Sequence, residues 1–148
     1  MLKNHFYDVY DLQHLSEIET VFKTDGLVGL NVTIPFKEKV VPYLDELSDE
    51  AEKTGAVNCI LIKDQVKKGY NTDVFGFEKT LVLHRKDFHD SALVLGNGGA
   101  AKAVKYVLEQ HQIPYQTVSR NADLNFGNLT AETVRKNRLI IQCTPVGT

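Results

Sequence analysis

An apolar run that ends in glycines, SALVLGNGGA (91–100), constrains the fold of this chain more than any other stretch. The helical sequence KAVKYVLEQH (102–111) follows it, and YQTVSR (115–120) then has the character of another strand. A polar helical stretch near LTAETVRKN (129–137) precedes the apolar RLIIQC (138–143). Strands that alternate with helices must cross over the sheet and pair in parallel. The second half therefore predicts an α/β fold with a parallel sheet.

The glycines of LVLGNGGAAKA (93–103) suit the first strand-to-helix turn of a dinucleotide-binding lobe. Such a turn needs glycines so that backbone amides can approach a pyrophosphate, which lies at the N-terminus of the following helix. Gly96, Gly98 and Gly99 fit this turn, and Ala101 stands where the usual fingerprint has its third glycine. The alternative is an ordinary glycine-rich turn, but the strand–helix–strand context favours nucleotide binding.

The end of the second strand bears on which nucleotide would bind. An NAD site places Asp or Glu there for the ribose hydroxyls, whereas a basic residue can receive the 2′-phosphate of NADP. Here the strand ends in Ser119, Arg120 and Asn121. Arg120 therefore favours NADP, with a solvated loop arginine as the alternative.

The first half mixes strands with helices. HFYDVYD predicts a short strand (5–10), and LSEIETVFKTDG predicts a helix that Ser16 caps and Gly26 ends. LVGLNVTIP (27–35) has the pattern of a buried strand, and PYLDELSDEAEKTG (42–55) that of a helix ended by Gly55.

Two further strands and a long helix complete this half. AVNCILI (56–62) and DQVKKGYNTD (64–73) predict strands joined by a turn at Asp64 and Gln65. TDVFGFEKTLVLHRK (72–86) suits a connecting helix. We therefore expect a mixed α/β lobe over residues 1–73, a connecting helix over 74–86 and a parallel-sheet lobe over 87–148.

Composition excludes several classes of partner. The 148 residues are 43% hydrophobic, and 17 basic and 19 acidic residues give a net charge of -2, so no basic face calls for nucleic acid. No apolar run approaches the ~20 residues of a membrane span, and MLKNHFYDVY is no signal peptide, so a cytoplasmic location is expected. Cys59 and Cys143 lack metal-ligand spacing, so we expect reduced thiols and no metal site.

Polar residues interrupt the strands of the first half. Asn31 and Thr33 alternate within an apolar strand, Asn58 lies inside AVNCILI, and GYNTD (69–73) precedes a helix. Buried polar groups need partners, so these residues either bond one another or line a cleft. Each also has a structural explanation alone, such as Thr72 or Asp73 capping a helix.

Five of these motifs together resemble the shikimate dehydrogenase family. NVTIPFKEK, GAVNCI, GYNTDVFGF, VLGNGGAAKAV and the terminal CTPVG stand in the family's order, from Asn31 to the end of the chain. The resemblance implies a mixed α/β substrate lobe followed by a Rossmann-like, parallel-sheet NADP-binding lobe, with the active site in the cleft between them. It also implies the reversible NADPH-dependent reduction of 3-dehydroshikimate to shikimate, in the biosynthesis of chorismate and aromatic amino acids. A quinate/shikimate variant and a non-catalytic folded fragment or binding module are the alternatives.

The resemblance assigns roles to individual residues. Lys37 matches the family's catalytic lysine and Asp73 its partner carboxylate, while Thr33, Asn58 and Asp73 match groups that hold the substrate hydroxyls. An ammonium can stabilise and protonate the alkoxide that forms as hydride reaches a carbonyl carbon. If these roles hold, the Lys37 ammonium and the Asp73 carboxylate lie in hydrogen-bond reach or one water apart. NADP binding is assigned to the glycine turn and two further loops: Gly96, Asn97, Gly98, Gly99, Ala100, Ser119, Arg120 and Thr144.

The chain also departs from the family pattern. The relatives are longer at both ends, so both lobes are expected to be truncated and the chain to be an internal fragment. Asn97 replaces the usual alanine of the glycine turn, and Leu124 stands where many relatives have a second basic residue. A parallel sheet without its terminal strand exposes an edge, which favours a homodimer.

Overall fold

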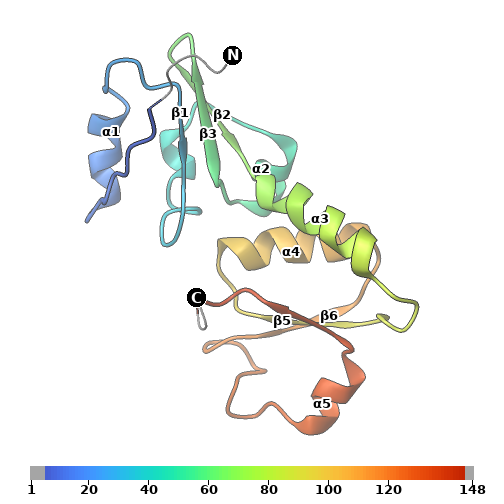
Figure 1. The fold of residues 1–148 in the computed structure, drawn as a ribbon. Helices are drawn as coiled ribbons and strands as arrows, with labels where there is room; N and C mark the ends of the chain where they lie inside the picture. The colour runs from blue at the N-terminus through green and yellow to red at the C-terminus, as the bar shows by residue number, and fades with distance from the viewer. Residues whose placement is uncertain (1–5, 146–148) are drawn as a thin grey trace.

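The computed structural model describes residues 6–145, which form two sheets with helices around and between them (Figure 1). The first half builds a four-stranded mixed sheet and the second half a three-stranded parallel sheet. The predicted α/β fold, a mixed lobe followed by a parallel-sheet lobe, is confirmed.

The first sheet has the strand order β1-β3-β4-β2. Its strands are β1 (Gly29–Asn31), β2 (Glu46–Leu47), β3 (Cys59–Lys63) and β4 (Val66–Tyr70). Strand β3 pairs antiparallel with both β1 and β4, whereas β2 runs parallel to β4. Asp64 and Gln65, at φ 50° and 67°, form the two-residue turn of the β3–β4 hairpin, as predicted.

The helices of the first half are short. They are η1 (Leu15–Glu17), α1 (Ile18–Val21), η2 (Val41–Tyr43) and α2 (Asp49–Thr54). Ser48 caps α2 by accepting from the Ala51 amide at 3.3 Å, and Gly55 ends it at φ 59°. The glycine stop is confirmed, but the longer helix predicted over 42–55 is wrong. Glu46 and Leu47 pair instead with Lys68 and Gly69 of β4.

Three further predictions for the first half are wrong. Residues 6–10 form no strand and pair with no sheet, and Phe6 and Val9 are 90% and 86% exposed; residue 5 lies outside the described residues. The first helical turn begins after His14 rather than Ser16, and α1 ends at Val21, before Gly26. The strand predicted over 27–35 is confined to Gly29–Asn31, because a turn begins at Ile34, whose side chain is 61% exposed.

The second sheet has the order β6-β5-β7, with all its strands parallel. Its elements are β5 (Ala92–Leu95), α4 (Gly99–Gln110), β6 (Tyr115–Val118), α5 (Ala131–Lys136) and β7 (Leu139–Gln142). The alternating strand and helix order predicted for this half is confirmed. Strand β5 is buried and central because both neighbours pair with it.

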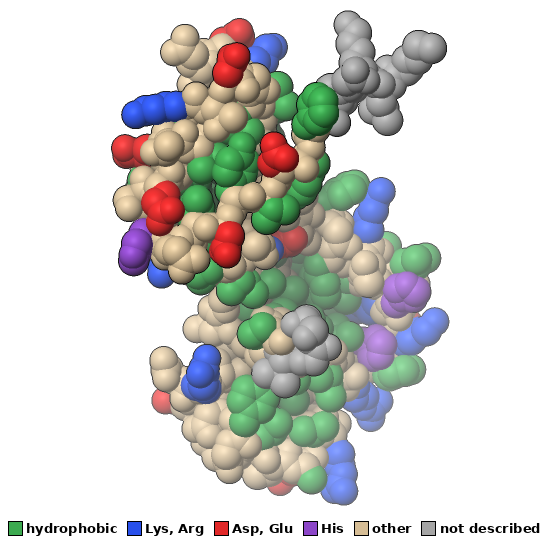
Figure 2. Space-filling model, turned by 60° about the vertical axis from the view of Figure 1, so that its left-hand side comes forward, with side chains coloured by type: hydrophobic (Ala, Val, Ile, Leu, Met, Phe, Trp, Pro, Cys, Tyr) green, Lys and Arg blue, Asp and Glu red, His purple; other side chains and the backbone are tan. Residues whose placement is uncertain are grey.

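Helix α3 (Thr72–His84) connects the two sheets and packs against α4 (Figure 1). Val74 and Leu81 of α3 belong to the hydrophobic core of the second half, together with α4 and β5. A separate core around Val40, Val57 and Ile60 fills the first half. The two separate cores match the two predicted lobes. The lobe boundaries at residues 73 and 86 remain a prediction. Hydrophobic side chains gather at the junction of the two parts on the face seen in Figure 2.

Candidate active site

Lys37 lies in the turn that follows β1, on the side of the first half that meets α4. The Lys37 carbonyl accepts from the Val57 amide at 2.7 Å, which ties this turn to the segment before β3. The side chain is 17% exposed, and its Nζ donates to Oδ2 of Asp73 at 2.8 Å. The predicted contact between the ammonium and the carboxylate is confirmed.

Asp73 lies in the first turn of α3, where the helix dipole favours a carboxylate. Its Oδ1 accepts from Nδ2 of Asn58 at 2.7 Å, while Oδ2 accepts from Lys37. Each carboxylate oxygen therefore has a donor, and Asp73 is oriented from two sides. Its side chain is 34% exposed, so the pair remains open to solvent and to a ligand.

Asn58 connects the end of the segment before β3 to the start of α3. Its Oδ1 accepts from the Thr72 amide at 2.9 Å, and its Nδ2 donates to Oγ1 of Thr72 at 2.9 Å. Asn58 is also held by its backbone, which pairs with Val32 and Tyr70. Asn58 thus bonds both Thr72 and Asp73, and we call Lys37, Asn58, Thr72 and Asp73 the polar cluster.

A second asparagine, Asn71, connects the start of α3 to the end of α2 and the segment after it. Asn71 is 5% exposed, and its Nδ2 donates to Oγ1 of Thr54 and to the Ala56 carbonyl, each at 3.0 Å. Asn71 is also the residue at the N-cap of α3, although its side chain makes no capping bond there. Neither Thr72 nor Asp73 is the cap.

Thr33 is not drawn into the polar cluster. Its side chain is exposed, and its carbonyl accepts from the Phe36 amide at 2.9 Å within the turn that leads to Lys37. Asn31 faces away toward the N-terminal segment, where its Nδ2 donates to the Tyr7 hydroxyl at 3.3 Å.

The glycine turn between β5 and α4 is closely packed on one side and open on another. Gly96 has φ 116°, and a Cβ there would lie 2.9 Å from the Cys143 carbonyl oxygen. A Cβ at Gly98, by contrast, would meet nothing within 4 Å. Close approach of the loop after β7 at Gly96 and open space at Gly98 fit a backbone cradle at the start of a helix, the arrangement that receives phosphates.

The same turn touches the lysine of the polar cluster. A Cβ at Gly99 would lie 3.0 Å from the Lys37 Cβ, so a larger residue there would displace the Lys37 side chain. Glu38 adds an ion pair across the junction, with its Oε2 2.5 Å from Nζ of Lys102 on α4. The polar cluster and the glycine turn are therefore adjacent.

The other residues predicted to bind NADP lie around the carboxyl ends of the parallel strands. Thr144 follows β7 and approaches Gly96, its Cγ2 3.2 Å from the position of a Cβ there. Ser119 donates its amide to the Leu124 carbonyl at 3.2 Å, and Arg120 is exposed with no ion-pair partner among residues 6–145. Asn97 accepts from Nζ of Lys105 at 2.6 Å, and Ala100 is part of the first turn of α4.

Sequence reasoning missed two side-chain contacts of this region. Glu38 and Lys102, which connect the two halves, are 64 positions apart, and no local spacing links them. Within the second half, Lys105 lies eight positions after Asn97 on the helix that the glycine turn begins. Because side chains on a helix point back toward its N-terminus, that spacing was the one available signal for this contact.

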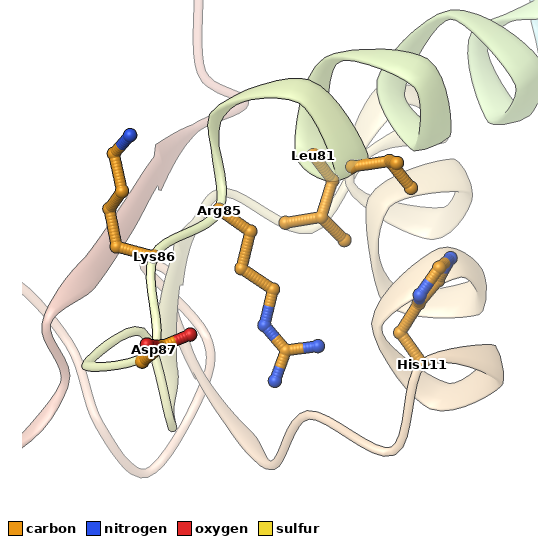
Figure 3. Close-up of a pocket in the computed structure, with 6 residues that line it drawn as sticks. Leu81, Arg85, Lys86, Asp87 and His111 are labelled. Carbon is orange, nitrogen blue, oxygen red and sulfur yellow. The ribbon is translucent and has the colours of Figure 1, made fainter.

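Two surface hollows lie away from the polar cluster. One, of about 500 Å³, is lined by the ends of α3 and α4 and the loop after α3: Leu81, Val82, Arg85, Lys86, Asp87 and His111 (Figure 3). Arg85 points between Asp87 and His111 in this view, whereas Lys86 points away. The second hollow, on α3, is lined by Glu78, Lys79, Val82 and Leu83. Neither hollow contains a residue that the sequence marks as catalytic.

Residues 6–145 contain no group of His, Cys, Asp and Glu side chains arranged to hold a metal ion. Both cysteines are free, and burial raises the pKa of the Cys143 thiol. Across the same residues, no helix has the length and apolar character of a membrane span.

Comparisons with known proteins point to one family. The model of the shikimate dehydrogenase substrate binding domain matches residues 3–60. A shikimate dehydrogenase (NADP(+)) of Chlorobium chlorochromatii is 40% identical over 83% of this chain and 50% of that protein. The chain spans about half the length of the curated relatives it matches.

Solved structures of shikimate 5-dehydrogenase are also similar to this chain. Shikimate 5-dehydrogenase of Thermus thermophilus in complex with shikimate aligns with a TM-score of 0.77 and 30% identity, over 90% of this chain and 56% of that one. The same enzyme in complex with NADP(H) and shikimate aligns with a TM-score of 0.71 and 30% identity, over 87% of this chain and 52% of that one.

Proposed function

Since this chain belongs to the shikimate dehydrogenase family, we propose that its polar cluster and glycine turn form the active-site region of an NADP-dependent oxidoreductase. The reaction is the reversible reduction of 3-dehydroshikimate to shikimate. The observation that carries the proposal is the contact of Lys37 with Asp73, in which Nζ lies 2.8 Å from Oδ2. This contact lies directly beside Gly99 of the glycine turn.

Lys37 has the position and chemistry of the proton donor. NADPH, when bound, supplies the hydride that the carbonyl carbon of 3-dehydroshikimate receives. The carbonyl oxygen gains negative charge as the new C–H bond forms, and the Lys37 ammonium stabilises that charge and transfers a proton to it. In the reverse direction neutral Lys37 accepts the hydroxyl proton of shikimate.

Asp73 and Asn58 would bind and orient rather than transfer protons. The Asp73 carboxylate holds the ammonium through Oδ2 and is itself held by Asn58 through Oδ1. Its partly exposed oxygens can also accept from the hydroxyl groups of the substrate. Thr33, exposed in the turn that leads to Lys37, would contribute its hydroxyl to the substrate rather than to the protein's own bonds.

The groups present also fit an NADP site. Gly96, Gly98 and Gly99 give the backbone approach that a pyrophosphate needs, and α4 directs its N-terminus at that charge. The first turn of α4 contains no acidic residue that would repel phosphates. Arg120, exposed and without an ion pair within residues 6–145, would receive the 2′-phosphate.

Turnover with shikimate and NADP, followed through nicotinamide absorbance, tests the proposal. We expect Lys37→Met to lower kcat by about 10²-fold or more, the range for loss of a positioned acid–base group. Lys39→Met is the matched control, because Lys39 is exposed and its replacement removes the same charge two residues away. A wild-type rate equal to that of Lys37→Met would contradict catalysis by this chain. Shikimate binding without turnover would instead identify a non-catalytic binding module.

A further inference from the structure

Lys105 is a charged residue above the glycine turn that the proposed mechanism does not use. It lies in the second turn of α4, and its side chain extends back toward the start of the helix. Its Nζ donates to Oδ1 of Asn97 at 2.6 Å. A positive charge is thereby held at the turn where the backbone cradle lies.

The partner of Lys105 is a neutral amide and not a carboxylate. Among residues 6–145 no Asp or Glu oxygen lies within 4.0 Å of its Nζ. Burial lowers the pKa of Lys105, which indicates that its charge is partly removed from water. The neighbouring Lys102 differs, because Glu38 already neutralises it. Within the described part of the chain, Lys105 is therefore the α4 lysine near the turn with no carboxylate in direct contact, and Glu109 acts on its charge only from a longer distance.

The order of the second sheet places this charge where a nucleotide would lie. The chain continues from β5 to β6 on one side, and β7 pairs with β5 on the other. The chain therefore leaves β5 toward one side of the sheet and later returns to the other side, so the strand order reverses between β5 and β7. In open α/β sheets, ligands bind outside the carboxyl ends of the strands at such a point. Gly96 follows β5 there, and Cys143, whose carbonyl oxygen would lie 2.9 Å from a Cβ at Gly96, follows β7.

We infer that Lys105 is a cofactor-binding residue whose ammonium, positioned by Asn97, donates to a phosphate oxygen of the dinucleotide. The inference rests on the proposed function, since it deepens the NADP site of the same turn. A helix N-terminus and a desolvated ammonium both favour the same anion, so Lys105 adds charge where backbone amides alone supply partial charge.

Titration of the full chain with NADP, followed by calorimetry, tests the inference. We expect Lys105→Met to raise the Kd for NADP about tenfold, the loss of one hydrogen bond to a charged group, and Lys105→Arg to restore most of the affinity. Inorganic pyrophosphate should compete with NADP for the wild type about tenfold better than for Lys105→Met. Lys79→Met on α3 is the control for loss of a helical lysine elsewhere and should leave Kd unchanged. Thermal unfolding without ligand verifies that each variant is folded.

Asn97→Ala separates a direct role from a structural one. The variant keeps the Lys105 charge and removes its tether, so it should weaken NADP binding less than Lys105→Met does if the ammonium contacts phosphate. Equal loss in Asn97→Ala and Lys105→Met would overturn the inference, because Lys105 would then act by holding the turn. A wild type that binds NADP only as well as Lys105→Met does would also overturn it, while leaving the proposed function intact. A wild type that binds no NADP would refute the cofactor assignment itself, and the role of Lys105 with it.

Discussion

Replacing Lys37 by Met and Asp73 by Asn, singly and together, measures the interaction on which the proposed site depends. Both replacements keep side-chain length or shape and remove one charge each. Asn at position 73 can still accept from Asn58 through its carbonyl oxygen, so the Asn58 contact is retained in the cycle. The double-mutant cycle therefore isolates the contact between the ammonium and the carboxylate.

The size of the coupling follows from the geometry and exposure of the pair. The contact is short, at 2.8 Å, and charge-assisted hydrogen bonds contribute about 1.5–3 kcal/mol. The Asp73 side chain is 34% exposed and Lys37 17% exposed, however, and exposed pairs contribute only about 0.2–1 kcal/mol. A coupling free energy of about 1 kcal/mol is expected for this intermediate case.

Urea unfolding of the four proteins gives the coupling from the change in the free energy of unfolding. Lys136 and Glu132 provide a control cycle, because their ion pair on α5 is 72% and 75% exposed and should couple by about 0.5 kcal/mol or less. Additive effects of Lys37→Met and Asp73→Asn would refute the reasoning, since the two side chains would not then interact in solution.

Three further outcomes follow from the packing and ionisation of the chain. Gly69→Ala should lower the free energy of unfolding by about 1–3 kcal/mol, because its Cβ would lie 2.6 Å from Leu44 Cδ1; an undiminished free energy would contradict that contact. Gly76→Ala, in the middle of α3 with nothing within 4 Å of the added Cβ, should raise it by about 0.5–1 kcal/mol, and a decrease would show the site to be crowded. Desolvation and the hydrogen bond to Glu109 raise the pKa of Tyr115 to about 12, so the stability from its protonated form is present below the ordinary tyrosine pKa of about 10. That contribution is lost between about pH 10 and pH 12, and Tyr115→Phe should make the pH–stability curve flatter there; an identical curve would contradict the shift.

Local sequence signals predicted the second half of the fold better than the first. Strand β5 is buried and central, and its glycine turn and the amphipathic α4 follow directly, so each local signal agrees with the tertiary contacts. The segment before α2 shows the opposite case. Glu46 and Leu47 lie within a pattern of helical spacing, but pairing with β4 overrides it, and no local rule reports a partner 22 residues away.

The candidate site was predictable only in part. Spacing alone indicated that polar residues in the strands need partners, and Asn58, Thr72 and Asp73 do bond one another. The contact of Lys37 with Asp73, 36 positions apart, came from the family resemblance and not from any periodicity. No local pattern indicated that Gly99 packs against Lys37, because that contact depends on how the two halves meet.

Titration of the isotope-labelled chain with shikimate, followed by backbone amide NMR, tests the central claim most directly. If the polar cluster binds the substrate, the largest shift changes fall on Lys37, Asn58, Thr72 and Asp73, and Lys37→Met weakens them. Shift changes confined to the hollow around Leu81 and His111, or none at saturating shikimate, would contradict the assignment of this cluster as the active site.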